Sequence, residues 1–492
     1  MDTITRLDLR SQRNLTMLVD FYELTMANGY LNTEADDTIA YFDMFFRKIP
    51  DGGGYCIMAG VQQLIEYLTN LKFTDEDIEY LRSKALFSEE FLNYLANFKF
   101  SCDVWAIPEG TPVFPNEPLV TVRGPVMEAQ FIETMILLTI NHQTLIATKA
   151  ARICEAASGR PVMEFGSRRA QGYDGALYGA RAAIIGGCNA TACTMADELF
   201  NVPVTGTMAH SWIQLFDSEY EAFVAWAKTY PDNTVLLVDT YNVLKSGIPN
   251  AIKVFDEILK PMGKRPKAVR IDSGDIAYLS IETRKMLDEA GYEDVKITIS
   301  NSLDEFIIKA VLDNGAKIDS FGVGERLITA RSEPVFGGVY KLVAIEKNGA
   351  IIPKIKISEN VEKITNPGFK SLYRVYDKKT NKAIADLIAL NDENFDNNKP
   401  LQLFDPNYTW KKKRIKNYNI KNLMVQIFDK GKCTYESPSV MEIREFCSKE
   451  KASLWSEIRR LQNPHQYYID LSKNLWNLKE SLLHEYSSIY EE

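Results

Sequence analysis

The amino-acid sequence predicts an α/β protein whose central part is a barrel of parallel strands joined by helices. Between residues 160 and 345, short apolar, β-branched runs end in Gly, Asp, Ser or Asn and lead into segments of helical periodicity. Six such units follow one another, which is the alternation expected of a parallel sheet. A doubly wound sheet would give much the same pattern, and the barrel is our preferred interpretation.

The elements of this central part follow from the same pattern. The expected strands are 161–165, 202–206, 234–239, 267–272, 296–300 and 318–324, with a further strand at 339–345. The expected helices are 175–199, 218–229, 250–259, 280–290 and 304–313. In such barrels the residues that carry the chemistry lie at the carboxyl ends of the strands, so these ends are where candidate residues are sought.

The flanking regions differ from the barrel in pattern and in charge. Residues 1–140 predict an N-terminal α+β domain, with strands at 38–48 and 104–114 around helical stretches between 60 and 97. A helical pattern at 128–157 leads into the barrel domain, 141–345.

Residues 346–492 predict a C-terminal extension with amphipathic helices at 440–461 and 471–486. Its basic run, 411–416, is interpreted as a solvated face without an assigned function. The net charge is −14 for residues 1–345 and +5 for the extension, which supports a boundary near residue 346.

Composition excludes several classes of protein. A chain of 492 residues with a net charge of −9 predicts two or three soluble domains and argues against a dedicated nucleic-acid binder. Seven widely spaced cysteines without a C-x-x-C pair favour a reducing cytoplasm. Neither a signal peptide nor an apolar run long enough to span a membrane is found. The sequence also lacks a P-loop and a G-x-G-x-x-G fingerprint.

Residues at the strand ends suit the binding of phosphate. Arg168 and Arg169 follow the first strand, and Gly322 and Gly324 lie in the last. Guanidinium groups offer forked donors to phosphoryl oxygens, and glycine-rich turns let backbone N–H groups approach an anion. The sequence therefore predicts an anion cradle formed by the two loops.

Other strand ends suggest a cation site and a reactive histidine. Asp239, Asp272 and Asp275 follow neighbouring strands and are candidate Mg²⁺ ligands, although a helix N-cap is the alternative role for an aspartate in this position. His210 is the histidine that lies in a strand-end loop, which makes it a candidate nucleophile or general base.

Eight segments carry a further signal: DFYELTMANGY (20–30), EFGSRRAQG (164–172), GTMAHSW (206–212), VDTYN (238–242), AVRIDSGD (268–275), SNSLDE (300–305), FGVG (321–324) and GGVYKLV (337–343). Taken in order, these segments resemble the nicotinate phosphoribosyltransferases of NAD salvage. They cover residues 14 to about 390, and as a set they are highly specific.

The resemblance implies an irregular α/β barrel of the type II phosphoribosyltransferase kind, with an N-terminal α/β domain, working as a homodimer. It implies that nicotinate and phosphoribosyl pyrophosphate give nicotinate mononucleotide and pyrophosphate, the first step of NAD biosynthesis from nicotinate. It further implies Mg²⁺ and coupling to ATP hydrolysis, which is ligase chemistry, through a phosphohistidine at His210.

The resemblance also implies roles for individual residues. Tyr22 and Phe165 match the aromatic residues that sandwich the pyridine ring, and Arg168 matches an arginine beside the ring and the phosphates. Thr207 and Arg270 match nicotinate contacts. Asp272 and Gly324 match positions that hold the ribose and the phosphate, whereas Asp239 and Asp275 are the metal candidates.

The chain departs from the family pattern at Glu325, where family members carry a small hydroxyl residue that touches the phosphoribosyl group. We expect either backbone donors alone in this loop or a Glu325 that faces away, and we leave it out of the site. Two alternatives remain: a nicotinamide-using relative, which the DFYELTM opening disfavours, and a non-catalytic nucleotide-sensing barrel, which the retained arginines and His210 disfavour.

Overall fold

Six short parallel strands form the sheet at the centre of the predicted barrel. The computed structural model describes residues 14–33, 38–406 and 408–488. The strands occur in the order β7 (Ala190–Thr191), β6 (Val162–Glu164), β11 (Ser320–Val323), β10 (Lys296–Ile299), β9 (Ala268–Ile271) and β8 (Val235–Leu237), and every pairing is parallel. The predicted central strands at β6 and β8–β11 are thereby confirmed.

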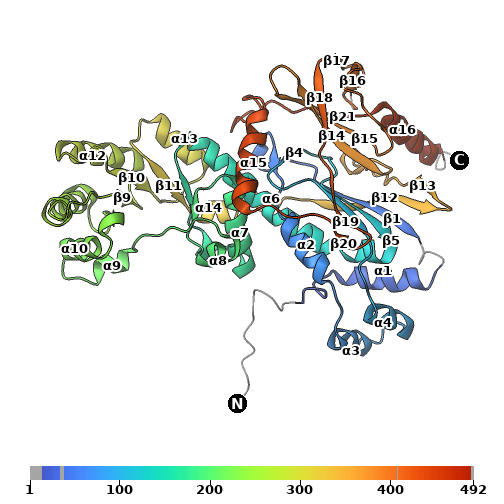
Figure 1. Ribbon diagram of the computed structural model, residues 1–492, viewed down its shortest axis with the longest axis horizontal. Helices are drawn as coiled ribbons and strands as arrows, with labels where there is room; N and C mark the ends of the chain where they lie inside the picture. The colour runs from blue at the N-terminus through green and yellow to red at the C-terminus, as the bar shows by residue number, and fades with distance from the viewer. Residues whose placement is uncertain (1–13, 34–37, 407, 489–492) are drawn as a thin grey trace.

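Helices follow these strands along the chain. They are α7 (Gly172–Gly186), α8 (Thr194–Phe200), α9 (His210–Gln214), α10 (Glu219–Thr229), α11 (Ile248–Val254), α12 (Ile276–Glu289), α13 (Glu305–Asp313) and α14 (Glu325–Ile328). Two π-helical turns, Val243–Gly247 and Phe255–Leu259, flank α11. Figure 1 shows β9 and β10 with α9, α10 and α12 at one end of the long axis of the molecule.

Two expected elements of the barrel are different in the structure. The single helix expected at 175–199 is α7 and α8 with β7 between them, because α7 ends at Gly186 and Gly187 follows with a φ of 130°. The strand expected at 202–206 is reduced to one parallel bridge, between Val204 and Thr191.

An irregular segment closes the barrel between its edge strands, β7 and β8. Val204 pairs with Thr191 of β7. Shortly afterwards the carbonyl of Met208 accepts a hydrogen bond from Arg270 of β9 (3.2 Å), and His210 lies 3.1 Å from the hydroxyl of Thr240, beyond β8. The chain from 204 to 210 therefore spans the gap, which agrees with the predicted irregular barrel.

A second, seven-stranded antiparallel sheet collects strands from three distant parts of the chain. Its order is β13 (Ala350–Pro353), β12 (Val339–Lys347), β1 (Ile39–Phe45), β5 (Val120–Pro125), β3 (Asp103–Ala106), β19 (Val425–Asp429) and β20 (Lys432–Cys433). The strand expected at 339–345 thus belongs to this sheet and not to the barrel, because β12 pairs with β1 from Ile39 to Phe45. The domain boundaries at residues 140 and 345 stay predictions. A helix (133–156) runs through the first of them, and β12 runs through the second.

The remaining N-terminal elements surround this sheet. They are α1 (Phe21–Leu31), α2 (Val61–Asn70), α3 (Asp75–Ser83), α4 (Glu89–Ala96), α5 (Val126–Phe131) and the pair β2 (Cys56–Ile57) with β4 (Pro112–Val113). The helix expected at 128–157 is α5 followed by α6 (Glu133–Ala156), which carries the chain into the barrel. Buried residues occur along most of α6, and its apolar side chains join one hydrophobic core that includes all parts of the chain.

The C-terminal region contains a four-stranded sheet that the sequence did not predict. Its order is β18 (Tyr418–Asn422), β14 (Lys370–Asp377), β15 (Ala383–Leu390) and β21 (Ile469–Leu471), beside the hairpin of β16 (Leu401–Phe404) and β17 (Lys412–Ile415). The helix expected at 471–486 is confirmed as α16 (Lys473–Ser488), whereas the one expected at 440–461 is α15 (Val440–Ser453) and ends eight residues earlier. In the described part of the chain, no helix combines the length and the apolar character needed to cross a membrane.

Candidate active site

His210 begins α9 and lies between two groups that fix its ring. Its Nδ1 atom is 3.1 Å from the hydroxyl of Thr240, and its Nε2 atom is 3.8 Å from the carboxylate of Asp272. The side chain is 40 % exposed, so the ring remains accessible from solvent. A histidine with one nitrogen at hydrogen-bond distance from a hydroxyl, the other near a carboxylate, and its ring open to solvent is suited to proton transfer or to nucleophilic attack.

Arg270 lies next to His210 on β9 and has no carboxylate partner within ion-pair distance in the described structure. Its Nη1 group donates to the hydroxyl of Thr207 and to the carbonyl of Met208 (3.2 Å), and its Nε atom is buried without a hydrogen-bond partner. Burial, with a smaller contribution from the nearby Arg168, lowers the pKa of Arg270. An anion placed against this guanidinium would remove an electrostatic penalty.

Asp239 and Asp272 end neighbouring strands and form a linked pair. One oxygen of Asp239 accepts hydrogen bonds from the backbone N–H of Asp272 (3.0 Å) and from the hydroxyl of Ser273 (2.6 Å). Its other oxygen, Oδ1, is buried without a partner. Asp272 accepts a hydrogen bond from Ser300 at 2.6 Å, so its second oxygen is left facing His210.

Phe165 packs against the last strand of the barrel at a position where only glycine fits. A Cβ atom on Gly322 would lie 2.5 Å from the ring of Phe165 and 3.2 Å from Cβ of Ser300. A Cβ atom on Gly324 would lie 3.1 Å from the carbonyl oxygen of Phe165. The glycines therefore allow the aromatic ring and the strand to approach closely, and Ser300 connects this contact to Asp272.

A buried glutamate holds the turn that carries Phe165 and the two arginines. Glu164 accepts hydrogen bonds from the backbone N–H of Gly166 and from the hydroxyl of Thr191 (2.6 Å). Burial raises the pKa of Glu164, whereas these two donors lower it. Arg168 and Arg169 follow in a 3₁₀ turn, Ser167–Arg169, and both are exposed.

Two predicted site residues lie apart from this cluster. Asp275 is exposed and caps α12 by accepting a hydrogen bond from the backbone N–H of Tyr278 at 2.9 Å, which is the alternative role expected for such an aspartate. Tyr22 lies on α1, where burial and the neighbouring Glu133 raise its pKa. Figure 1 shows α1 beside the seven-stranded sheet, far along the molecule from β9 and β10.

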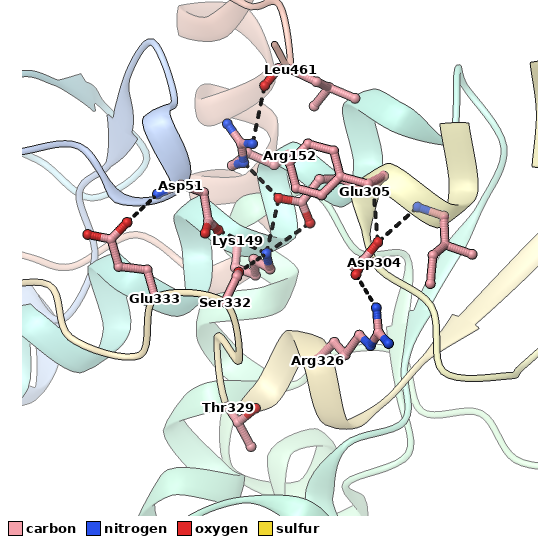
Figure 2. A network of polar contacts seen from close by, with 12 residues as sticks. Asp51, Lys149, Arg152, Asp304, Glu305, Arg326, Thr329, Ser332, Glu333 and Leu461 are labelled. Atoms are coloured by element: carbon pink, nitrogen blue, oxygen red, sulfur yellow. Dashed lines mark hydrogen bonds and ion pairs between the residues drawn. The ribbon is translucent and has the colours of Figure 1, made fainter. Parts of the chain in front are cut away.

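A buried polar network, shown in Figure 2, supports the loops behind the site. Lys149 of α6 donates to Asp51 (2.9 Å), to Glu305 (3.0 Å) and to Ser332 (2.8 Å). Arg152, one turn further along α6, donates to Glu305 at 2.9 Å. The side chains of Lys149 and Glu305 are 3 % and 0 % exposed, so these charges compensate one another without water.

The network reaches both loops that follow β10 and β11. Asp304 caps α13 by accepting hydrogen bonds from the backbone of Phe306 (3.0 Å) and Ile307 (2.9 Å), and Arg326 of α14 pairs with its other oxygen. Ser332 lies beyond α14 and contacts Lys149. The loop that carries Ser300 and the strand that carries Gly322 are therefore tied to α6 and to Asp51 of the N-terminal region (Figure 2).

Known proteins are similar to this chain over most of its length. The profile of the nicotinate phosphoribosyltransferase N-terminal domain matches residues 17–141, and that of the C-terminal domain matches residues 369–479. A nicotinate phosphoribosyltransferase of Bacillus subtilis is 44 % identical over 97 % of this chain and 97 % of its own length. The chain belongs to the nicotinate phosphoribosyltransferase family. The resemblance seen in the sequence is thereby confirmed.

Further nicotinate phosphoribosyltransferases support the assignment. One from Dictyostelium discoideum is 34 % identical over 95 % of this chain and 88 % of its own length. The crystal structure of human nicotinic acid phosphoribosyltransferase superposes with a TM-score of 0.83 at 28 % identity, covering 94 % of this chain and 99 % of that one. The predicted fold class is therefore confirmed as well.

Glu325, the departure from the nicotinate phosphoribosyltransferase pattern, is directed toward a neighbouring cation. Its carboxylate lies 3.3 Å from Arg331, and both side chains are largely exposed. Three residues that fix the site were not singled out from the sequence, namely Glu164, Thr240 and Ser300. Each lies inside a family segment, and each owes its role to a contact between different strand ends.

Proposed function

We propose that this protein joins nicotinate to phosphoribosyl pyrophosphate, forming nicotinate mononucleotide and pyrophosphate. The observation that carries the proposal is the guanidinium of Arg270, which has a buried Nε atom without a partner beside His210 and Asp272. Family membership supports the same reaction, the first step of NAD biosynthesis from nicotinate. The odd number of widely spaced cysteines, all free thiols, supports a cytoplasmic setting.

Nicotinate is a planar anion, so Arg270 and Phe165 suit its carboxylate and its ring, respectively. Arg270 would bind its carboxylate, with Thr207 holding the guanidinium in place. Phe165 offers an aromatic face, since its ring packs on Gly322 and not on a bulkier side chain. Nicotinamide lacks the negative charge, so it would gain less from Arg270.

Phosphoribosyl pyrophosphate would bind across the neighbouring strand ends. Arg168, Arg169 and the glycine-rich turn at Gly322 and Gly324 offer donors for its phosphates, and Asp272 is placed to accept hydrogen bonds from ribose hydroxyls. In the transfer, the bond from ribose C1 to pyrophosphate breaks, pyrophosphate leaves with the electron pair, and the nicotinate nitrogen bonds to C1. Positive charge develops on the sugar, and the carboxylate of Asp272 would stabilise it.

Asp239 and Asp272 fit a magnesium ion carried by the substrate phosphates. Asp239 has one buried carboxylate oxygen without a hydrogen-bond partner, and Mg²⁺ is commonly held by one or two carboxylates together with phosphates. Asp275, the other metal candidate, would have to release α12 to contribute. The ion would neutralise charge on the departing pyrophosphate.

ATP would act through His210. A ring nitrogen attacks the γ-phosphorus, ADP leaves, and water later hydrolyses the phosphohistidine, which couples ATP hydrolysis to turnover. Thr240 lies at hydrogen-bond distance from Nδ1, and the carboxylate of Asp272 lies on the side of Nε2, where it would stabilise a positively charged ring. A phosphorylated ring would favour one state of substrate binding or product release, without taking part in bond formation at the sugar.

A homodimer would complete the site. Tyr22 matches the second aromatic residue that covers the pyridine ring in the family, yet α1 lies far from the barrel strand ends of its own chain (Figure 1). We therefore propose that Tyr22 serves the barrel of a second copy. Mixing Tyr22→Ala and Arg270→Ala variants should then restore activity in hybrid dimers, and a mixture as inactive as its components would contradict this role.

The reaction is tested with the purified protein, Mg²⁺, phosphoribosyl pyrophosphate and either nicotinate or nicotinamide at equal concentration. We expect faster use of nicotinate, and Arg270→Ala should raise its KM by at least about tenfold, the value of one hydrogen bond to an ion, with less effect on the sugar phosphate. Arg265→Ala, at the other end of β9 and paired with Asp294, is the control. Preferred use of nicotinamide would overturn the proposal, and binding without pyrophosphate release would indicate a sensor.

The role of ATP is tested separately. His210→Ala should abolish ³²P labelling from [γ-³²P]ATP and the stimulation by ATP, while weak ATP-independent transfer persists. His484→Ala, exposed on α16, should behave like the unmodified protein. Undiminished labelling of the His210 variant would assign the phosphorylation to another residue.

A further inference from the structure

A cavity in the C-terminal region has not been used by any part of the proposed reaction. It has a volume of about 850 Å³ and lies between the β16–β17 hairpin, the turn from β14 to β15 and the loops at 455–458 and 465–468. This volume is in the range of pockets that hold small metabolites. Figure 1 shows the β16–β17 hairpin near β18, the edge strand of the C-terminal sheet, away from the barrel strands.

The floor of the cavity is apolar and its rim is aromatic. Ile415, Ile458 and Tyr467 are buried residues that line it. At the rim, Trp455 and Tyr468 are 45 % and 50 % exposed, which is high for such large side chains. The indole N–H of Trp455 donates to the carbonyl of Ala383 at 2.9 Å, so the ring is fixed while its face stays open.

The charged residues that line the cavity leave positive charge available. They are Lys379, Lys413, Arg414, Lys416, Asp377 and Glu457. Asp377 already accepts hydrogen bonds from the backbone of Lys379 (3.1 Å) and Thr380 (2.7 Å), and Glu457 accepts one from Ser456 (3.0 Å).

Arg414 and Lys416 are two exposed cations of this lining. Within the described ranges, neither has a carboxylate within ion-pair distance, and both belong to the basic run 411–416 that the sequence left without a function. Burial raises the pKa of Asp470 to about 7, and the charge of the nearby Lys413 offsets part of this rise. An anion from outside is therefore the partner that Arg414 and Lys416 lack.

We propose that this cavity binds a nucleotide, with an aromatic base between Trp455 and Tyr468 and a chain of two or more phosphates at Arg414 and Lys416. Base stacking on an aromatic ring and ion pairing with phosphate are both favourable at a partly exposed surface. The site is separate from His210 and Arg270, and it would let nucleotide levels act on the protein from outside the barrel.

The geometry favours a small nucleotide over a nucleic acid. The chain is acidic overall, with a net charge of −9, and Arg414 and Lys416 lie at a concave site beside aromatic side chains. A nucleic-acid surface normally extends a basic face along many phosphates.

The experiment measures energy transfer from tryptophan to the fluorescent nucleotide mant-ADP in the full-length protein. We expect Trp455→Phe to remove one saturable component of the energy-transfer signal. Trp212→Phe, which changes a tryptophan close to His210 in the chain, should retain this component. Charge reversal by Arg414→Glu with Lys416→Glu should weaken binding of this component at least about tenfold, the effect of losing one hydrogen bond to an ion. Lys412→Glu lies in the same strand outside the cavity and should change it less than about twofold, as expected for an exposed charge.

Competition defines the ligand class. ADP should displace the probe at lower concentration than adenosine or inorganic triphosphate, because it offers both the base and the phosphates. The proposal would be overturned if the saturable component persisted in Trp455→Phe, or if its affinity were unchanged by the charge reversal. Either result would count independently of whether the barrel catalyses the proposed reaction. Tighter competition by a single-stranded oligonucleotide than by ADP would also overturn it, in favour of a nucleic acid.

Discussion

Replacing Lys149 by methionine tests whether the buried network of Figure 2 holds the catalytic loops. The side chain is 3 % exposed, and its ammonium group uses three hydrogen bonds, to Asp51, Glu305 and Ser332. Methionine has a similar length but no charge and no donor. The variant therefore removes the cation and leaves the surrounding packing nearly unchanged.

The expected loss of stability depends on which cationic partners Glu305 and Asp51 keep in the variant. Glu305 keeps Arg152 at 2.9 Å, whereas Asp51 loses its cation and its side chain is only 9 % exposed. Removing one partner of a buried ion pair costs about 3–5 kcal/mol, and a hydrogen bond to an ion contributes about 1.5–3 kcal/mol. Because Arg152 remains, we expect a loss of about 3 kcal/mol in the free energy of unfolding.

Urea unfolding monitored by circular dichroism measures this loss, and Lys48→Met provides the control. Lys48 pairs with Glu333, which in turn accepts a hydrogen bond from the backbone of Asp51, but the lysine side chain is 75 % exposed. An exposed pair contributes about 0–1 kcal/mol. Equal effects of the two lysine substitutions would refute the reasoning that burial makes Lys149 important.

Two further predictions concern the glycine contact and the pH dependence. Gly322→Ala should raise the KM for nicotinate, because the new Cβ would lie 2.5 Å from the ring of Phe165. Gly206→Ala, where a new Cβ would meet nothing within 4 Å, should leave the KM unchanged. Steady-state kinetics measures both variants, and equal KM values would contradict the proposed role of Phe165 as an aromatic wall. Burial raises the pKa of Glu23 from its ordinary 4.5 to about 8, so its stabilising contribution is complete below pH 4.5 and is lost as the pH rises through 8. In Glu23→Gln, whose amide oxygen can still accept from Thr134, the unfolding midpoint should fall less between pH 6 and pH 9, and parallel declines would count against this titration.

The parallel strands of the barrel could be predicted because their signal is local. Strands β6, β9 and β10 lie inside the predicted segments, and polar residues follow each of them directly. The βα alternation also places the polar residues at one edge. Thr207, His210, Arg270 and Asp272 are accordingly brought together as the sequence indicated.

The seven-stranded sheet and the C-terminal sheet could not be predicted in the same way. Strand β12 lies between β13 and β1, and β1 is almost 300 residues away in the chain, as the pair Phe45–Val339 illustrates. Only tertiary packing determines such partners, and strands β16 to β20 are two to five residues long, too short for their alternation to stand out in the sequence. The same reason explains Ser300, Thr240 and Glu164, whose roles depend on contacts across neighbouring strand ends.

The buried arginines of this chain differ in whether a carboxylate neutralises them. Arg181 pairs with Glu109, Arg374 with Asp386 and Arg152 with Glu305, so each of these guanidinium groups is neutralised within the fold. Arg270 contacts a hydroxyl and a carbonyl instead, and its nearest acids, Asp239 and Asp272, are engaged by Ser273 and Ser300. An acidic region with ample carboxylates has thus left the partly buried Arg270 without a neutralising partner. A protein whose substrate is an anion needs such a residue, because a neutralised guanidinium would have to lose an ion pair before it could gain one.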